Sequence, residues 1–453
     1  MTVVGLARSG FAACALLAER GARVVGTDRS PAGELRVDLA DLARRGVRLE
    51  TGGHSEQCFL EADLIVVSPG VDSRLALLAR ARSRGIPVWG EVELAYRVTA
   101  APFIGITGTK GKGTTATLLG EILRQGGKNA VVAGNIGRPL CEVVPTLPRE
   151  TWVVAELSSF QLEEIVSFRP RIAVLLNLAP DHLDRYAAAA DYYAAKSRIF
   201  AYQTAEDIAV LNADDPLVLQ YAQEARARVH LFSRTRTVGE GAFVRGGRLV
   251  VRRDGRTQTI CETSAIRMPG AHNLENSLAA CAAAGAAGAG PEPMAGVLNA
   301  FEGRPHCMEV VAQVDGVRFI NDSKATNVFA VGRALEAVDN PVILIAGGRD
   351  KREDFRPLAP LVRRRVKALI AIGEARGKIL AEIGGECPAA EEAAGMADAV
   401  ERASRRAAPG DVVLLSPGCT SFDMFQNAEE RGEVFRRAVR KVESRGEAVE
   451  RER

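Results

Sequence analysis

The sequence predicts an α/β protein whose domains are each built around a mainly parallel sheet. Short apolar segments alternate with helical stretches along the chain, a pattern typical of parallel sheets covered by helices. Two of these segments, residues 152–155 and 172–176, are continuously apolar, as strands buried on both faces usually are. At 453 residues the chain is too long for one core, so we expect about three domains.

We place the domain boundaries where this alternation restarts. Residues 1–92 form the first predicted domain, residues 93–302 the central domain and residues 303–453 the third. Within the central domain the pattern changes between residues 234 and 263, where short strands flank paired glycines and turn residues. That stretch predicts a local antiparallel addition to the central sheet.

The composition is that of an ordinary globular protein. Hydrophobic residues make up 47% and charged residues 25%, and the net charge of +3 gives no reason to expect nucleic-acid binding. The Ala/Gly-rich run at residues 279–290 is too short and too weakly apolar to span a bilayer. The eight cysteines are scattered, which is typical of buried thiols in a reducing compartment. We therefore expect a cytoplasmic monomer without membrane or nucleic-acid partners.

A glycine-rich turn with a lysine predicts a phosphate-binding loop. Residues 104–107 form an apolar strand, and a helix is predicted over residues 116–123. Backbone N–H groups and the positive end of a helix dipole then face one point, which suits a phosphate. The spacing G-x-x-G-K is shorter than the consensus of phosphate-binding loops, G-x-x-x-x-G-K-[ST]. An ordinary turn therefore stays open as the alternative. The predicted nucleotide-binding residues are Gly108, Thr109, Lys110, Gly111, Lys112, Gly113, Thr114 and Thr115.

The first domain begins with a glycine-bearing turn that resembles a dinucleotide-binding motif. Ala7 replaces its middle glycine, which weakens the case for NAD and leaves a pyrophosphate ligand such as a UDP-sugar as the better reading. Arg8 and Arg29 would add positive charge. An ordinary strand-ending turn is the alternative for residues 68–70. The predicted ligand-binding residues here are Arg8, Ser9, Asp28, Arg29, Ser68, Pro69 and Gly70.

In the central domain a carboxylate and a histidine follow two apolar strands. Glu156 at a strand end beside a phosphate loop is the arrangement that holds Mg²⁺, although an exposed helix-start glutamate is an alternative. His182 lies between two aspartates and is a plausible ligand or substrate contact, with a structural histidine as the alternative. Composition alone predicts that Lys196, on an amphipathic helix, is a solvated lysine.

The third domain carries polar segments after its apolar strands. Residues 321–327 read Asn-Asp-Ser-Lys-Ala-Thr-Asn, and residues 347–351 read Gly-Gly-Arg-Asp-Lys. Two lysines, a threonine and backbone amides near one strand edge could bind a small dicarboxylate. An ordinary charged loop is the alternative.

Together these segments resemble the Mur ligases of peptidoglycan synthesis over essentially the whole chain. The glycine-lysine loop belongs to the wider superfamily, which includes folylpolyglutamate synthases, whereas residues 321–327 are more particular to its D-glutamate-adding branch. The further resemblances lie at residues 134–137, 156–163, 181–186, 193–196, 272–276, 305–306 and 415–423.

The resemblance implies a Rossmann-like N-terminal domain that binds UDP, a P-loop central ATPase domain and a Rossmann-like C-terminal domain that binds D-glutamate. It implies an ATP-dependent ligase. ATP phosphorylates the terminal carboxylate of UDP-N-acetylmuramoyl-L-alanine, and the amine of D-glutamate attacks the acyl phosphate. Charge on the transferring phosphoryl group would be stabilised by Lys112 and Mg²⁺.

The resemblance also implies roles for single residues. Lys112, Glu156, His182 and Lys196 would be the catalytic residues, and Lys196 would carry a carbamate. Metal ligands would come from Glu156, His182 and the Lys196 carbamate, and either Thr114 or water would replace the hydroxyl ligand that Gly113 lacks. Asn276 would contact adenine, and Asn135 and His182 the muramoyl substrate. D-Glutamate would be held by Lys324, Thr326, Lys351 and Ser421.

Three positions depart from the family pattern. Gly113 replaces the hydroxyl residue after the loop lysine, Cys307 stands where many relatives have an arginine, and Ala428 stands where an aromatic residue often closes on D-glutamate. Two alternatives therefore stay open. They are a ligase of the folylpolyglutamate synthase type and a nucleotide-binding regulator without turnover.

Overall fold

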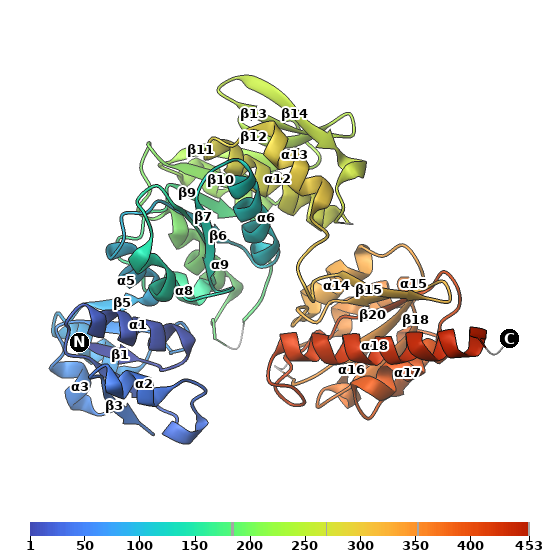
Figure 1. Ribbon diagram of the computed structural model, residues 1–453, viewed down its shortest axis with the longest axis horizontal. Coiled ribbons are helices and arrows are strands. Elements are labelled where there is room, and N and C mark those ends of the chain that lie inside the picture. Colours follow the sequence, from blue (N-terminus) through green and yellow to red (C-terminus); the bar gives the residue numbers. More distant parts are fainter. Residues whose placement is uncertain (183–184, 269, 351–352, 452–453) are drawn as a thin grey trace. The chain divides into compact units, whose positions relative to one another are not determined.

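The computed structural model describes residues 1–182, 185–268, 270–350 and 353–451. Three sheets are found in these ranges, of five, nine and six strands (Figure 1). The chain divides into two compact units, of which the first comprises Met1–Ile266 with Glu275–Asn299 and the second Arg267–Leu274 with Ala300–Arg453. The first unit contains the first two sheets. The predicted fold class is confirmed, because most strand pairs are parallel.

The N-terminal sheet has the strand order β3-β2-β1-β4-β5, and all its pairs are parallel. Alternate residues of a strand face opposite sides: Val3 packs with helices α1 and α5, whereas Val4 packs with α3 and α4. The elements are β1 (Thr2–Val4), α1 (Arg8–Glu19), β2 (Val25–Asp28), α2 (Leu39–Arg44), β3 (Arg48–Thr51), α3 (Glu56–Leu60), β4 (Ile65–Val67), α4 (Ala76–Ser83), β5 (Val88–Gly90) and α5 (Glu91–Arg97).

The central sheet has the order β14-β13-β12-β11-β10-β9-β6-β8-β7. Strands β12, β13 and β14 pair antiparallel, which confirms the predicted antiparallel addition. The elements are β6 (Phe103–Thr107), α6 (Lys112–Gln125), β7 (Ala130–Gly134), α7 (Leu140–Val143), β8 (Trp152–Glu156), α8 (Ser159–Glu163), β9 (Ile172–Leu175), α9 (Ala189–Ser197), β10 (Ile208–Asn212), α10 (Pro216–Leu219), α11 (Tyr221–Glu224), β11 (Arg228–Ser233), β12 (Gly241–Arg245), β13 (Arg248–Arg253), β14 (Arg256–Glu262), α12 (Ala271–Ala286) and α13 (Pro291–Ala300).

The third sheet has the order β15-β16-β20-β17-β18-β19, and β15 is its antiparallel edge strand. Its two faces bury separate apolar clusters: Leu344 packs with α14, α15 and α16, whereas Ile343 and Ile345 pack with α17 and α18. The elements are β15 (Glu309–Val314), β16 (Val317–Asn321), α14 (Val328–Glu336), β17 (Val342–Gly347), α15 (Ala359–Arg365), β18 (Val366–Ile372), α16 (Arg376–Ile383), β19 (Ala390–Glu392), α17 (Met396–Arg406), β20 (Val412–Leu415) and α18 (Ala428–Arg451).

Strand order explains where the polar segments gather. In the central sheet β6 lies between β8 and β9, with Ile106 opposite Glu156 and Thr107 opposite Leu175. The phosphate loop after β6 therefore lies between the segments that follow β8 and β9. The same arrangement holds for β2-β1-β4 and for β16-β20-β17. Each sheet thus collects its candidate residues at the carboxyl edge of three neighbouring strands.

Candidate functional site

The phosphate loop runs from the end of β6 to the start of α6 and depends on two glycines. Gly108 has φ +149°, and Gly111, which precedes α6, has φ +84°. A Cβ at Gly108 would lie 3.0 Å from the Leu176 Cβ, and one at Gly111 would lie 2.2 Å from Asn276 Oδ1. Glycine is therefore required at Gly111 both for the left-handed backbone and for the close approach of Asn276.

We expect Gly111→Ala to weaken ATP binding and to lower the melting temperature. The left-handed conformation costs a residue with a side chain about 1–2 kcal/mol, and the added methyl would displace Asn276. Gly127→Ala is the matched control, because Gly127 has φ +73° and open space around it. Calorimetric ATP titration and thermal unfolding of both variants separate the two effects. Equal ATP affinity in the two variants would contradict the proposed crowding at Asn276.

Hydrogen bonds fasten the phosphate loop to the segment after β9. The Thr109 N–H donates to the Asn177 carbonyl at 3.0 Å, and the Lys110 N–H donates to Asn177 Oδ1 at 2.9 Å. The Thr109 hydroxyl donates to the Ala179 carbonyl at 3.2 Å and accepts from the Ala179 N–H at 3.0 Å. Lys110 Nζ lies 3.8 Å from Asp181 Oδ2. The loop is thus held in shape by protein groups.

Two lysines share one acceptor in this loop. Lys112 Nζ donates to the carbonyls of Gly108 at 2.9 Å and Thr109 at 3.0 Å, and Lys196 Nζ donates to the Gly108 carbonyl at 2.8 Å. The prediction of a solvated Lys196, made from composition, is wrong, because only 1% of the residue is exposed. Burial, followed by repulsion from Lys112, holds the pKa of Lys196 well below its usual value.

Tyr192 supports this lysine pair, and it was missed in the sequence. The Lys196 ammonium lies 4.5 Å from the centre of the Tyr192 ring, and the Tyr192 hydroxyl lies 3.5 Å from Thr109 Oγ1. The ring also lies 5.9 Å from that of His182. Tyr192 precedes Lys196 by four residues on α9, a spacing that places both on one helix face and could have indicated the pair.

Glu156 ends β8 with one carboxylate oxygen engaged and the other not. The residue is 3% exposed, so the alternative of an exposed helix-start glutamate is wrong. Asn135 Nδ2 donates to Glu156 Oε1 at 3.0 Å, whereas the buried Oε2 has no hydrogen-bond partner among the described residues. An unsatisfied buried carboxylate oxygen is costly unless a ligand completes it. Because Mg²⁺ prefers oxygen ligands, Glu156 fits a divalent cation.

We expect Glu156→Gln to weaken Mg²⁺ binding at least about tenfold while leaving the melting temperature unchanged or higher. The substitution keeps the Oε1 acceptor for Asn135 and removes an unsatisfied buried charge. Glu163→Gln is the control, because both its oxygens are engaged, by Tyr186 at 2.5 Å and by Arg185 at 2.7 Å, so that variant should melt at a lower temperature. Magnesium titration and thermal unfolding provide both readings. A stability loss in Glu156→Gln equal to that of the control would contradict the assignment.

His182 follows β9 in an unusual backbone conformation. Its φ is +55°, and its N–H donates to Asp181 Oδ1 at 2.9 Å. The ring packs against Phe160 with centroids 4.8 Å apart. A non-glycine residue in this region is strained, which is common at functional sites. In the ranges that the structure describes, no three His, Cys, Asp or Glu side chains are grouped so as to hold a metal ion by themselves.

The remaining nucleotide-site residues lie on α6 and α12. Gly113 is buried and Thr114 half-buried in the first turns of α6. Thr115 is fully buried, and its hydroxyl donates to Asn276 Oδ1 at 3.4 Å. Asn276 therefore contacts the phosphate loop itself, at Gly111 and Thr115. Its predicted contact with adenine stays a prediction.

In the N-terminal sheet the predicted ligand residues follow β1, β2 and β4. Asp28 accepts from the N–H groups of Leu6 at 2.6 Å and Ser30 at 2.9 Å, so both its oxygens are bound to backbone. The Arg8 Nη2 group donates a hydrogen bond to the carbonyl of Gly137, which is two residues after Asn135 in the sequence. Ser68 is buried, Ser9 and Pro69 are half-buried, and Arg29 and Gly70 are exposed.

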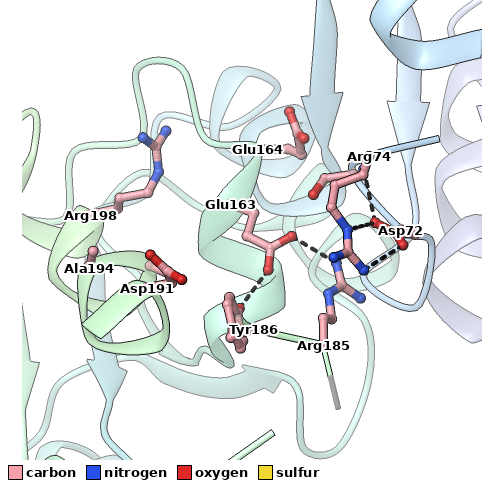
Figure 2. Close-up of a pocket in the computed structure, with 11 residues that line it drawn as sticks. Asp72, Arg74, Glu163, Glu164, Arg185, Tyr186, Asp191, Ala194 and Arg198 are labelled. Carbon is pink, nitrogen blue, oxygen red and sulfur yellow. Dashed lines mark hydrogen bonds and ion pairs between the residues drawn. The ribbon is translucent and has the colours of Figure 1, made fainter. Parts of the chain in front are cut away.

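A cavity of about 440 Å³ lies where the turn after β4 meets α8 and α9. Figure 2 shows Glu163 at its centre, bonded to Tyr186 and Arg185, with the Asp72–Arg74 pair beside it. Arg185 also donates to the Pro69 and Val71 carbonyls at 3.2 and 3.0 Å. Arg185 thereby links the turn of the predicted UDP site to the segment that carries His182.

In the third sheet the predicted D-glutamate residues follow β16 and β20. Lys324 Nζ donates to Glu429 Oε1 at 2.6 Å, Thr326 is half-buried and Ser421 is 2% exposed. Lys351 lies outside the described residues. The Cys307 N–H donates to the Arg304 carbonyl in a turn, and the carbonyl of Ala428 accepts from the Ser323 hydroxyl at 2.7 Å.

Three largely parallel sheets, with a lysine-bearing phosphate loop at the carboxyl edge of the central one, define a nucleotide-binding α/β protein of the phosphate-loop class. Three family models match the chain. The MurD-like N-terminal domain of Mur ligases matches residues 1–90, the Mur ligase middle domain residues 106–284, and the glutamate ligase domain residues 306–419. The chain belongs to the Mur ligase family.

Relatives match over nearly the full length. A UDP-N-acetylmuramoylalanine–D-glutamate ligase of Geotalea daltonii is 48% identical over 438 residues, 97% of this chain and 96% of the relative. A ligase of the same name from Pelotomaculum thermopropionicum is 45% identical over 443 residues, 96% of each chain.

Solved structures with low identity share the fold. MurF from Acinetobacter baumannii is 17% identical with a TM-score of 0.61, and it covers 96% of this chain and 93% of its own. E. coli FolC in complex with ADP is 18% identical with a TM-score of 0.57, covering 77% of this chain and 93% of its own. Within the described part of the chain, no helix is both long and apolar enough to cross a membrane.

Proposed function

We propose that this protein is an ATP-dependent ligase that adds D-glutamate to UDP-N-acetylmuramoyl-L-alanine in the synthesis of peptidoglycan precursors. The observation that carries the proposal is the near-full-length similarity, at 48% identity, to a relative named for that reaction. ATP transfers its γ-phosphoryl group to the terminal carboxylate and ADP leaves. The D-glutamate amine then attacks the acyl phosphate, and phosphate is released.

The chain's own residues support the phosphoryl step. The ammonium of Lys112 lies against the loop that would receive the β- and γ-phosphates, so its charge would oppose the charge that builds on the transferring group. The N-terminus of α6 would present its first N–H groups to the same phosphates, whereas the N–H groups of Thr109 and Lys110 are bonded to Asn177 and hold the loop in shape. His182, Asn135 and the N-terminal residues after β1, β2 and β4 would bind and orient the UDP substrate.

A divalent cation fits the unsatisfied Glu156 oxygen. We infer that Glu156, His182, Thr114 and a carbamate on Lys196 would hold it. Bound there, Mg²⁺ would neutralise charge on the phosphoryl oxygens. The low pKa of the buried Lys196 favours the neutral amine, which is the form that reacts with CO₂ to give the carbamate and a proton.

Several predicted properties stay proposals. The domain boundaries at residues 92–93 and 302–303, a cytoplasmic location and a monomeric state belong to this group. Lys324, Thr326, Lys351 and Ser421 are proposed to bind D-glutamate.

The test is phosphate release from ATP by the purified protein. We expect release only when UDP-N-acetylmuramoyl-L-alanine and D-glutamate are both present. Equal activity with L-glutamate would contradict the proposed acceptor. Tight ATP binding with no release under any acceptor pair would favour the nucleotide-binding regulator, and activity with a folate acceptor would favour the folylpolyglutamate synthase type.

A further inference from the structure

Arg431 of α18 is a fully buried arginine at the carboxyl edge of the third sheet. It is 0% exposed and is among the largest fully buried side chains. Its Nε donates to Ser323 Oγ at 3.0 Å and its Nη2 to the Ser323 carbonyl at 2.8 Å. Its Nη1 donates to the Cys419 carbonyl at 3.0 Å. Every hydrogen bond recorded for this guanidinium in the described residues goes to a neutral oxygen.

The charge of Arg431 is therefore balanced by no hydrogen-bonded carboxylate in the described residues, and the nearby charges of Asp423 and Asp322 act to raise its pKa against burial. Burial lowers its pKa to about 10, so the group stays protonated near neutral pH. A buried cation without a bonded carboxylate is costly and needs a reason for its presence. By contrast, the half-exposed Lys324 has its charge compensated by Glu429.

The acceptors of Arg431 belong to the two loops that carry proposed D-glutamate residues. Ser323 immediately precedes Lys324 in the loop after β16, and Cys419 lies two residues before Ser421 in the loop after β20. Strands β16 and β20 are parallel neighbours, so their loops emerge side by side. The loop after β17 also leaves room for this arginine, because a Cβ at Gly348 would lie 3.1 Å from Arg431 Nη1.

We propose that Arg431 is the positioning residue of the acceptor site, which fixes Lys324 and Ser421 relative to each other and supplies a buried positive charge beneath the carboxylates of D-glutamate. The inference rests on the proposed function. It assigns to α18 a part in acceptor recognition that the motif residues alone do not include. A dicarboxylate gains from such a charge because the low-dielectric interior screens it weakly.

The experiment compares Arg431→Lys, Arg431→Gln and Ser323→Ala with the exposed Arg437→Lys on the same helix. Arg431→Lys keeps the positive charge but loses the several N–H donors of the planar guanidinium, whereas Arg431→Gln loses both the charge and these donors. We expect the KM for D-glutamate to rise at least about tenfold in Arg431→Lys and further in Arg431→Gln. The KM values for ATP and the UDP substrate should stay within about twofold. Ser323→Ala removes the Arg431 Nε bond to the Ser323 hydroxyl and the bond of that hydroxyl to the Ala428 carbonyl, keeps the Nη2 bond to the Ser323 carbonyl, and should give a smaller rise.

Thermal unfolding is recorded for every variant, so that a loss of folded protein is separated from a loss of recognition. If the Arg431 variants do not fold, Ser323→Ala becomes the test of the proposal. An unchanged KM for D-glutamate in Ser323→Ala would overturn it. A fall in kcat with all three KM values unchanged would mean a purely structural role. If the unmodified protein shows no D-glutamate-dependent turnover, the proposed function fails and takes this inference with it. If it turns over normally and the variants keep its KM, only this inference fails.

Discussion

Lys112→Ala is expected to lower turnover at least about 100-fold, the largest effect that we predict for a single side chain. The lysine ammonium lies against the loop backbone that would cradle the phosphates, and it is held there by the Gly108 and Thr109 carbonyls. Charge develops on the phosphoryl group only as it transfers, so its stabilisation should appear in kcat more than in the KM for ATP.

Lys110→Ala is the matched control for this variant. Lys110 lies in the same loop, but its ammonium is paired with the Asp181 carboxylate, 3.8 Å from Oδ2. Lys110→Ala should therefore lower turnover much less than Lys112→Ala does. Steady-state phosphate release measures both variants. Turnover of Lys112→Ala within tenfold of the unmodified protein would contradict the role assigned to this lysine.

Lys196→Ala is expected to reduce turnover to a similar extent, for a different reason. The residue is buried and its pKa is lowered, which favours the neutral amine that can take up CO₂. A carbamate would turn this position into an anionic oxygen ligand. Short carboxylates added to Lys196→Ala should therefore restore part of the activity.

The pH dependence of this effect has a definite sign. Carbamate formation requires the unprotonated amine, so activation by added bicarbonate should be lost as the pH falls through the lowered pKa of Lys196. Carbon-13 NMR with labelled bicarbonate should give a carbamate resonance in the unmodified protein and in Lys112→Ala, but not in Lys196→Ala. No resonance in the unmodified protein, together with no rescue by carboxylates, would rule out the modification.

Much of the fold could be predicted because buried parallel strands are continuously apolar. The predicted strands near β6, β8 and β9 match their observed positions within a residue or two. Edge strands escaped notice: β19 is the short run Ala390–Glu392, with two glutamates at the rim of its sheet, and β5 has three residues. Strands exposed at an edge need no apolar run, so their sequences resemble loops.

Site residues could be predicted where they belong to one short sequence motif. They could not be predicted where their role depends on burial of the side chain in the folded protein. The two loop glycines and Lys112 form one short motif and were recognised as such. Lys196 was not recognised, because nothing in the sequence of α9 shows that its buried face meets the carbonyl of Gly108, which lies 88 residues earlier in the phosphate loop. The resemblance to relatives, rather than its composition, pointed to a function for it.

Arg431 illustrates the same limit in the third sheet. It lies in a charged helix in which arginine is common, and only its contacts with Ser323 and Cys419, more than a hundred and about a dozen residues away, distinguish it. A guanidinium on an amphipathic helix is normally solvated. Long-range packing, which a single sequence does not display, decides the difference.

The shared Gly108 carbonyl sets an order of events. Lys112 repels the charged form of Lys196, and this repulsion helps to keep the Lys196 amine neutral. A triphosphate arriving in the loop would bring negative charge close to both lysine side chains and draw Lys112 toward itself, which favours protonation of Lys196. Capture of CO₂ would then be most favourable in the nucleotide-free protein, so a carbamate on Lys196 would form before the nucleotide binds.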